Sequence, residues 1–232
     1  GIPVFAGAGD GQAAGLGAGV DRPGVAYLNL GTAVVSGVWS GAPLMSSAFR
    51  TLFGAAPGSF FLETDLKGGT FMLNWLTERF LGGADRTAAI ESLWAEAARL
   101  PPGAEGLMLV PYWCGVMNPW WDDDAAGVVV GWRGHHGQAH LFRAMVEGVA
   151  FEQRLHTEGV VAATGEPLEA FIIMGGGARS PLWRQIIADV TGVPVRLAAT
   201  DEAAALGAGI LAAVGAGLHP DLTTAVHAMT ER

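Results

Sequence analysis

Apolar runs in the first 40 residues predict a strand, a helix and a hairpin. Residues 2–6 are apolar and run into glycines, which is typical of a strand, and a helix of small residues is expected from about Gln12. Residues 25–30 and 34–39 are rich in β-branched and aromatic residues, and a short glycine-containing stretch separates them. This pattern predicts two strands joined by a tight turn.

Apolar positions at helical spacing predict helices further along the chain. Such positions recur within 69–81, and 85–99 is a second amphipathic segment. A long helix is expected to begin near Gln138. Another is expected after Ser180, because serine is a favoured N-cap residue and Pro181 suits the first helical position.

Strands and helices alternate through the second half of the chain. Strands are expected within 106–113, 126–132, 169–177 and 193–199, and two helices follow the last of these segments. Alternation of this kind is typical of an α/β domain in which helices cover a mixed sheet. Because no low-complexity linker interrupts the alternation, residues 1–232 are interpreted as a single domain.

Composition and charge narrow the classes of partner. The chain has 232 residues, of which 50% are hydrophobic and 15% are charged, so it can bury a sizeable core. Its net charge is −9 and Lys67 is its one lysine, so neither nucleic acid nor a membrane surface is an expected partner. The most apolar segment, 203–218, is short for a bilayer span and is interpreted as an internal helix.

The cysteine content and the first residues bear on cellular location. Cys114 has no second cysteine to pair with, so it is interpreted as a buried, inert thiol in a reducing compartment. The sequence begins without methionine and without the charged start of a signal peptide. We therefore expect a cytoplasmic protein, of which this chain is one part.

Glycine-rich turns after apolar segments suggest phosphate binding, but two common motifs are absent from the sequence. The Walker pattern needs a lysine after its second glycine, and Lys67 lacks that context. The dinucleotide fingerprint fails at Gln12 in the first glycine-rich segment and at Ser180 in the last. Neither a P-loop NTPase nor a Rossmann dinucleotide site is expected.

Two other glycine loops could present backbone N–H groups to phosphate oxygens. Gly31 and Thr32 form a turn that adds a hydroxyl donor. Residues 175–178 offer bare backbone next to the helix expected after Ser180, whose amino-terminal end favours anions. Taken singly, each loop is better explained as a structural turn, because glycine at a strand end needs no ligand.

Asp10 has two interpretations on its own. As an N-cap, its carboxylate would accept hydrogen bonds from the first backbone N–H groups of the helix that follows, and residue type alone favours this role. Between a strand and a helix at the rim of a sheet, the same carboxylate could instead serve as a catalytic group. Residue type thus favours the N-cap, and the catalytic role stays open.

Two clusters of ring side chains are also candidates. His136 and His140 could share a helical face, but no third ligand accompanies them, so structural or solvent-facing histidines and no metal site are expected. Aromatic faces can stack on sugars, although such rings more often pack a long loop onto the body, and residues 122–124 are interpreted as a solvated turn. The aromatic cluster consists of Tyr112, Trp113, Trp120 and Trp121.

The order and spacing of these segments match one known arrangement. Over essentially its whole length the chain resembles the C-terminal domain of the FGGY carbohydrate kinases, which include xylulose, ribulose, gluconate and glycerol kinases. The resemblance implies an actin-like, ribonuclease-H-like ATPase domain, α/β with a mixed sheet flanked by helices. It is carried by GAGDGQAAGLGAG at 7–19, LNLGTA at 28–33, GVVVGWRGHHGQAHLFRAMVEGVAF at 127–151, MGGGARSPLWRQIIADVTGVPV at 174–195 and DEAAALGAGILA at 201–212.

The resemblance also implies roles for individual residues. Asp10 matches the catalytic aspartate and is therefore the expected general base. ATP and Mg²⁺ are the implied cofactors, with the metal held by the phosphates rather than by a protein site. The residues implied to bind the nucleotide are Gly31 and Thr32 in a phosphate loop, Thr70 and Asn74 on a flanking helix, and Gly176, Gly177, Ala178 and Pro181 in the adenosine motif.

The implied activity is ATP-dependent phosphorylation of a hydroxyl on a ketose, polyol or sugar acid. Glycerol is not the expected substrate, since Gly11 stands where glycerol kinases have glutamine. The resemblance also implies that a sugar-binding N-terminal domain is absent here, so the isolated domain is expected to be inactive. The missing domain is therefore an expected partner. A second copy of this chain is another, because removing that domain would expose an apolar cleft wall through which two copies could associate. An actin-like regulatory or assembly module without kinase activity, and a carbohydrate-binding module, stay open as alternatives.

Overall fold

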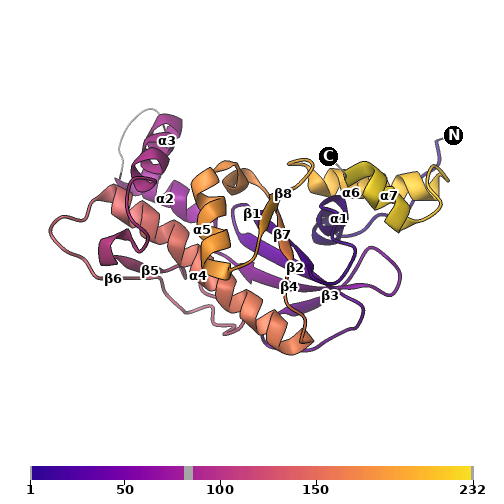
Figure 1. Ribbon diagram of the computed structural model, residues 1–232, viewed down its shortest axis with the longest axis horizontal. Coiled ribbons are helices and arrows are strands. Elements are labelled where there is room, and N and C mark those ends of the chain that lie inside the picture. The colour runs from indigo at the N-terminus through magenta and orange to yellow at the C-terminus, as the bar shows by residue number, and fades with distance from the viewer. Residues whose placement is uncertain (1, 81–85, 231–232) are drawn as a thin grey trace.

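A six-stranded mixed sheet forms the centre of the computed structural model, which describes residues 2–80 and 86–230 (Figure 1). The strand order is β3-β4-β2-β1-β7-β8. Pairing is antiparallel from β3 to β1 and parallel from β1 to β8, so the predicted mixed sheet is confirmed. The strands are β1 (Val25–Leu30), β2 (Val34–Ser40), β3 (Arg50–Phe53), β4 (Phe60–Leu66), β7 (Ala170–Met174) and β8 (Val195–Leu197).

Helices cover both faces of this sheet. One layer contains α1 (Asp10–Gly17), α6 (Ala203–Gly215) and α7 (Leu222–Thr230), which lie together near both chain ends in Figure 1. The other layer contains α4 (Gln138–Thr164) and α5 (Pro181–Thr191), with α2 (Thr70–Phe80) and α3 (Arg86–Ala97) packed near the start of α4. The hairpin of β5 (Met108–Val110) and β6 (Val128–Val130) lies against α4, and the 3₁₀ turns η1 (Ala104–Gly106) and η2 (Gly176–Arg179) complete the elements.

Side chains of β1 show that both faces of the sheet are buried. Ala26, Leu28 and Leu30 are inaccessible to solvent and belong to the large core beneath α4 and α5. Val25 and Tyr27 point the other way, into a smaller core that includes residues of α1 and α6. A strand covered on both sides is expected to be apolar throughout, which explains the run VAYLNL.

A buried ion pair fixes the start of α4 to the segment that follows α3. Arg143 donates from Nε to Oε1 of Glu147 at 2.6 Å, and its Nη1 donates to the carbonyl oxygens of Ala97 and Leu100. Glu147 also accepts a hydrogen bond from the backbone N–H of Gly103. These bonds hold α3 against α4, and α3 forms one wall of the pocket described below.

Most predicted elements are confirmed, and the Ser180 N-cap is observed directly. The Ser180 hydroxyl accepts from the Trp183 backbone N–H, and Gly192 ends that helix in the left-handed conformation. The predicted helix over 69–81 spans Thr70–Phe80, while its last predicted residue, and residue 85 of the next one, lie outside the described residues. Segment 203–218 is the helix α6, as expected.

Two predictions are wrong, and two strands were not predicted. Residues 2–6 form no strand: Ile2 and Val4 are each 92% exposed, because the edges of the sheet are β3 and β8 and no strand lies beside this segment. Strands β3 and β4 were not anticipated, since charged residues interrupt their apolar pattern. Cys114 is exposed rather than buried, because it lies in the loop between β5 and β6.

Within the ranges described, no helix combines the length and the apolar character that crossing a bilayer requires.

Helices α1 and α6 approach so closely that their backbones touch. A Cβ atom on Gly17 would overlap the carbonyl oxygen of Ala203, and one on Gly207 would overlap that of Ala13. Since these atoms belong to backbone, neither helix can move aside cheaply. Glycine at both positions therefore sets the separation of α1 from α6.

We expect Gly207→Ala to lower the free energy of unfolding by about 1–3 kcal/mol, because the added methyl group forces α1 and α6 apart. Gly209→Ala is the matched control on the same helix: its Cβ would meet only Met229, 4.0 Å away, so the greater helix propensity of alanine should leave stability unchanged or raise it by up to about 1 kcal/mol. Urea denaturation of both variants tests this, and equal stabilities would contradict it.

Candidate active site

The predicted glycine loops meet at one edge of the sheet. Strands β1 and β7 run parallel with Asn29 opposite Met174, so both end at the same edge. The first continues into the turn at Gly31 and the second into Gly175 and η2. A Cβ on Gly175, whose φ is +85°, would lie 3.0 Å from the carbonyl group of Leu30, so the two loops are in direct contact.

The amino-terminal end of α2 is bound to the first of these loops. The backbone N–H of Gly69 donates to the carbonyl oxygen of Thr32 at 3.0 Å, and that of Thr70 donates to Gly31 at 2.8 Å. Thr70 begins α2, and Asn74 lies one turn further along it with an exposed side chain. The structure thus brings the predicted residues of α2 beside the predicted phosphate loop.

A pocket of about 460 Å³ opens between α2, α3 and the start of α5. Five of the eight residues predicted to bind the nucleotide line it, whereas Gly31 and Thr32 lie outside its lining and Ala178 is buried behind the loop. The five are Thr70, Asn74, Gly176, Gly177 and Pro181, and the remaining lining residues are Leu73, Ile90, Glu91, Trp94, Arg179, Ser180 and Trp183.

Aromatic rings and bare backbone both line this pocket. Trp94 and Trp183 stack at a tilt, with ring centroids 5.8 Å apart. The Nε1–H of Trp183 is buried and finds no acceptor among the described residues. Gly177 packs on the Trp183 ring, while a Cβ on Gly176 would meet open space. Such a pocket can hold a flat ring beside the partly exposed Trp94 and anionic groups against the glycine backbone.

Asp10 lines a second pocket, of about 310 Å³, on the α1 face of the sheet. Helix α1 begins at Asp10, two residues before the predicted start, and its N-cap is Gly9. The Asp10 side chain is exposed, and its Oδ1 accepts from the N–H of Gly11 at 2.8 Å. Asp10 is therefore the first residue of the helix rather than its N-cap. The pocket is lined by Asp10, Gly11, Ala14, Tyr27, Asn29, Val35, Arg50, Glu63 and Ala204.

A polar network that sequence reasoning missed forms the wall of the Asp10 pocket. Glu63, whose side chain is 8% exposed, accepts from Nη2 of Arg50 at 2.5 Å and from the Tyr27 hydroxyl at 3.2 Å. Arg50 lies 3.5 Å from Asp65 as well. Burial raises the pKa of Tyr27, and the charges of Glu63 and Asp10 raise it further, while Arg50 opposes the shift.

Burial likewise raises the pKa of Asp65, and the Arg50 guanidinium opposes that shift. One oxygen of this carboxylate, Oδ1, is buried without a partner among the described residues. The signal that could have revealed the network is the pair of acids at Glu63 and Asp65 in FFLETDL, which are two residues apart and therefore share one face of the strand. An alternating strand that carries charge on one face predicts that this face meets an opposite charge.

Asn29 connects the two pockets. It lines the Asp10 pocket. Its side-chain amide lies close to Gly31 and Gly175, the glycines of the two loops that meet at this edge of the sheet. It also sits at the end of β1, where the two pockets approach each other across the sheet edge. An exposed carboxylate and a glycine-lined pocket are thus arranged around one strand end.

The two ring clusters contribute to structure. Nδ1 of His136 and of His140 accepts a backbone N–H, while Nε2 faces Glu105 in each case. Among the described residues no group of three histidine, cysteine, aspartate or glutamate side chains could hold a metal ion. In the aromatic cluster, Trp113 packs on Trp75, and Trp121 donates to the Ser47 carbonyl oxygen.

Trp120 of the aromatic cluster remains 61% exposed, so packing explains the cluster only in part. The aspartates 122–124 are exposed, as the predicted solvated turn requires, and Asp123 pairs with Lys67 at 2.5 Å.

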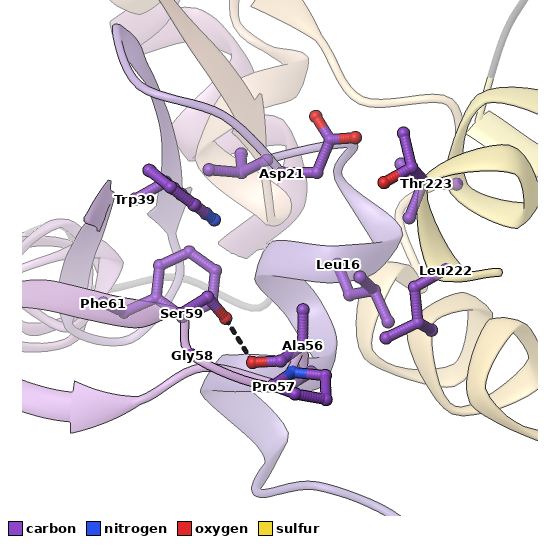
Figure 2. Close-up of a pocket in the computed structure, with 13 residues that line it drawn as sticks. Leu16, Asp21, Trp39, Ala56, Pro57, Gly58, Ser59, Phe61, Leu222 and Thr223 are labelled. Atoms are coloured by element: carbon purple, nitrogen blue, oxygen red, sulfur yellow. Dashed lines mark hydrogen bonds between the residues drawn. The ribbon is translucent and has the colours of Figure 1, made fainter. Parts of the chain in front are cut away.

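A third pocket, of about 200 Å³, lies near the other end of α1 and is shown in Figure 2. Leu16 of α1 and Leu222 of α7 face Trp39 and Phe61 of the sheet across it. Ser59 donates to the Ala56 carbonyl oxygen in the turn that closes one side. The pocket contains none of the predicted site residues. The candidate active site therefore consists of the first two pockets and the loop at Gly31 and Thr32, which lines neither of them.

Comparison with known proteins assigns the class. The model of the FGGY family of carbohydrate kinases, C-terminal domain, matches residues 26–216. The glycerol kinase of Geobacter sp. strain M21 is 34% identical over 223 residues, which cover 94% of this chain but 44% of that protein. The crystal structure of xylulose kinase from Rhodospirillum rubrum, 32% identical, superposes with a TM-score of 0.85 over 97% of this chain and 45% of that one.

A structure of Plasmodium falciparum glycerol kinase with ADP is 21% identical and has the same TM-score of 0.85 over 100% of this chain and 46% of that chain, which shows the fold. The chain belongs to the FGGY family of carbohydrate kinases and corresponds to its C-terminal domain. The predicted actin-like α/β fold is confirmed. The chain spans less than half the length of the relatives it matches.

We expect Tyr27→Phe to lower the free energy of unfolding by about 1 kcal/mol or more at neutral pH, because buried Glu63 loses a donor. Since the pKa of Tyr27 is raised above its ordinary 10.0, this contribution is complete below pH 10 and is lost as pH rises further. The free energies of unfolding of the unmodified protein and of Tyr27→Phe should therefore differ most below pH 10. Tyr112→Phe is the control, because Tyr112 bonds to Glu152 at a less buried position. Equal losses in urea denaturation at pH 7 would contradict the prediction.

Proposed function

We propose that this chain is the ATP-binding half of a carbohydrate kinase that phosphorylates a hydroxyl of a small sugar or polyol. The observation that carries the proposal is the placement of an exposed carboxylate and a glycine-lined pocket around one end of β1. The family supports it, because the matched relatives include glycerol and xylulose kinases.

The residues of the larger pocket fit a nucleotide. Gly176 leaves open space beside its backbone, and the α5 amino-terminal end lies next to it. In this proposal Gly177, Ala178 and Pro181 shape the adenosine side, and Thr70 and Asn74 flank it from α2. Gly31 and Thr32 provide the turn nearest to the Asp10 pocket, where the phosphates would be held together with Mg²⁺.

Asp10 is the general base in this proposal. ATP, when bound, supplies the phosphoryl group that the sugar hydroxyl receives. The Asp10 carboxylate accepts the proton of that hydroxyl, which makes its oxygen a better nucleophile. Asp10 suits this task because it is exposed in the pocket and accepts only one local hydrogen bond, from Gly11.

A second domain completes the site in this proposal. The relatives are more than twice the length of the matched region, so the sugar would bind in a cleft between this domain and another one. We expect this chain alone to bind ATP without turning sugar over. Phosphorylation of a sugar by the 232-residue chain would contradict that expectation.

Asp10→Asn in the protein that carries both domains should lower kcat by about 10²–10⁴-fold, because the amide cannot accept the proton, while ATP binding stays within a factor of about two. ADP release in a coupled assay and calorimetric titration measure the two quantities. Asp189→Asn is the control, since Asp189 is exposed on α5 and bonds to Gln185. Undiminished turnover by the Asp10 variant would assign the reaction to another base.

Gly176→Ala should weaken ATP binding by about tenfold without changing the melting temperature. Its methyl group would enter open space on the pocket side of the loop, where the proposal places the nucleotide against bare backbone. Gly134→Ala is matched to it, because a Cβ there also meets nothing within 4 Å but lies in a remote loop. Calorimetric titration of both variants of this chain with ATP and Mg²⁺, and with ADP, tests this. Equal affinities in the two variants would mean that the nucleotide does not bind against this loop.

A further inference from the structure

The outer face of the β5–β6 hairpin is apolar and uncovered. These strands form a sheet of two, in which Met108 lies opposite Val130 and Val110 lies opposite Val128. The four side chains are between 39% and 58% exposed, while Leu109, which points the other way, is buried against α4. Exposed side chains directly opposite each other on paired strands lie in contact, so the four form one apolar strip.

Two aromatic side chains extend this strip. Phe151 of α4 is 50% exposed and lines one pocket together with Met108, and Trp132 follows Val130 by two residues and is 52% exposed. Large apolar side chains that are exposed singly are ordinary, but several neighbours on one face mark an interaction surface. The hairpin patch consists of Met108, Val110, Val128, Val130, Trp132 and Phe151.

A groove of about 310 Å³ lies beside the patch, between the hairpin and α4. Glu147 is the one charged residue among those that line it, and this carboxylate is buried and already paired with Arg143 at 2.6 Å. Gly106 lines the groove, and its carbonyl oxygen lies against Gly131, the residue before Trp132. A half-exposed indole and an apolar groove thus lie side by side on one surface.

The position of the hairpin patch argues against the other domain as its occupant. This chain corresponds to the C-terminal domain of its family, so the rest of such a protein joins it at the amino-terminal side. Figure 1 shows the hairpin at the opposite end of the long axis from the N-terminus. A domain that meets this one across the Asp10 pocket therefore leaves the patch uncovered.

The charge of the molecule favours a second copy of this chain at the patch. The net charge of −9 makes two copies repel each other in most orientations. A two-fold interface also places the same surface on both copies, so any charge on it would face its own like. The hairpin patch carries no charged side chain, and Glu147 in the groove is paired, so contact here avoids both penalties.

We infer that two copies of this chain associate through the hairpin patch, with Trp132 of each copy seated in the groove of the other. Because the indole and the groove lie side by side, one two-fold axis beside them makes both contacts at once. A tryptophan in an apolar pocket is a typical centre of binding energy. This inference does not depend on the proposed kinase activity.

The size of the surface suits a dimer. A stable interface takes about 800 Å² from each copy. Six large apolar side chains that are about half exposed offer on the order of 500 Å². The groove walls and the rim around the patch supply the remainder.

Sedimentation equilibrium of the protein that carries both domains tests the inference, because there the cleft wall is not left bare. We expect a dimer with a Kd of about 10 μM or lower. Trp132→Ala should raise this Kd by at least about tenfold, since alanine leaves the groove empty. Trp120→Ala is the matched control: Trp120 is 61% exposed near Asn118, which accepts from the backbone of β4 rather than from the hairpin.

Val130→Glu is the second variant, because the two-fold contact would bring its new carboxylate into an apolar interface. This variant should be monomeric up to about 100 μM, whereas Leu218→Glu, at a position 75% exposed after α6, should dimerise like the unmodified protein. Melting curves establish that the variants are folded, and Trp132→Ala decides if Val130→Glu is not.

An unmodified protein that stays monomeric up to about 100 μM overturns the inference. A dimer that survives both Trp132→Ala and Val130→Glu overturns it as well, because the two copies would then meet at another surface.

Discussion

The parallel pairing of β1 with β7 is the constraint on which the candidate site depends. These strands are separated by about 140 residues of sequence, yet Val25 lies opposite Ala170 and both strands run in the same direction. Their carboxyl ends therefore share one edge, and the loops at Gly31 and Gly175 touch there. If the pairing were antiparallel, those two loops would lie at opposite ends of β1, and no pocket could join them. Open α/β sheets commonly bind ligands outside the carboxyl ends of their strands.

The position of Asp10 depends on a second constraint, the close crossing of α1 and α6. Glycines at 17 and 207 let the two backbones touch, which holds α1 on the sheet face that carries Tyr27 and Glu63. This contact explains why both helices are built from alanine and glycine. Because α1 starts at the end of the sheet where the two loops meet, its first residue is presented to the pocket while its later residues are buried.

Much of the secondary structure and the fold class could be predicted from the sequence, because they follow from local patterns and from the family resemblance. Periodicity predicts α4 and α5, and the turn residues predict the β1–β2 hairpin. The expectation for residues 2–6 failed because an apolar run forms a strand only where a partner strand exists. The Arg50–Glu63 pair was missed because it depends on the register of two strands, which local periodicity does not reveal. The nearness of the two glycine loops came from the family resemblance rather than from spacing.

The charged wall of the Asp10 pocket is better explained by chemistry than by stability. The Arg50–Glu63 pair is partly buried, with the Arg50 side chain 41% exposed, and a pair of this kind contributes little net stability once the cost of taking the Glu63 charge out of water is counted. One oxygen of the neighbouring Asp65 is buried without a partner among the described residues, which adds to that cost. Yet the cluster lies where the sheet face opens into the pocket, and the charge of Asp10 in that pocket helps to raise the pKa of Tyr27. Arg50 and Glu63 therefore supply charge to the wall of the Asp10 pocket at a place where they add little to stability.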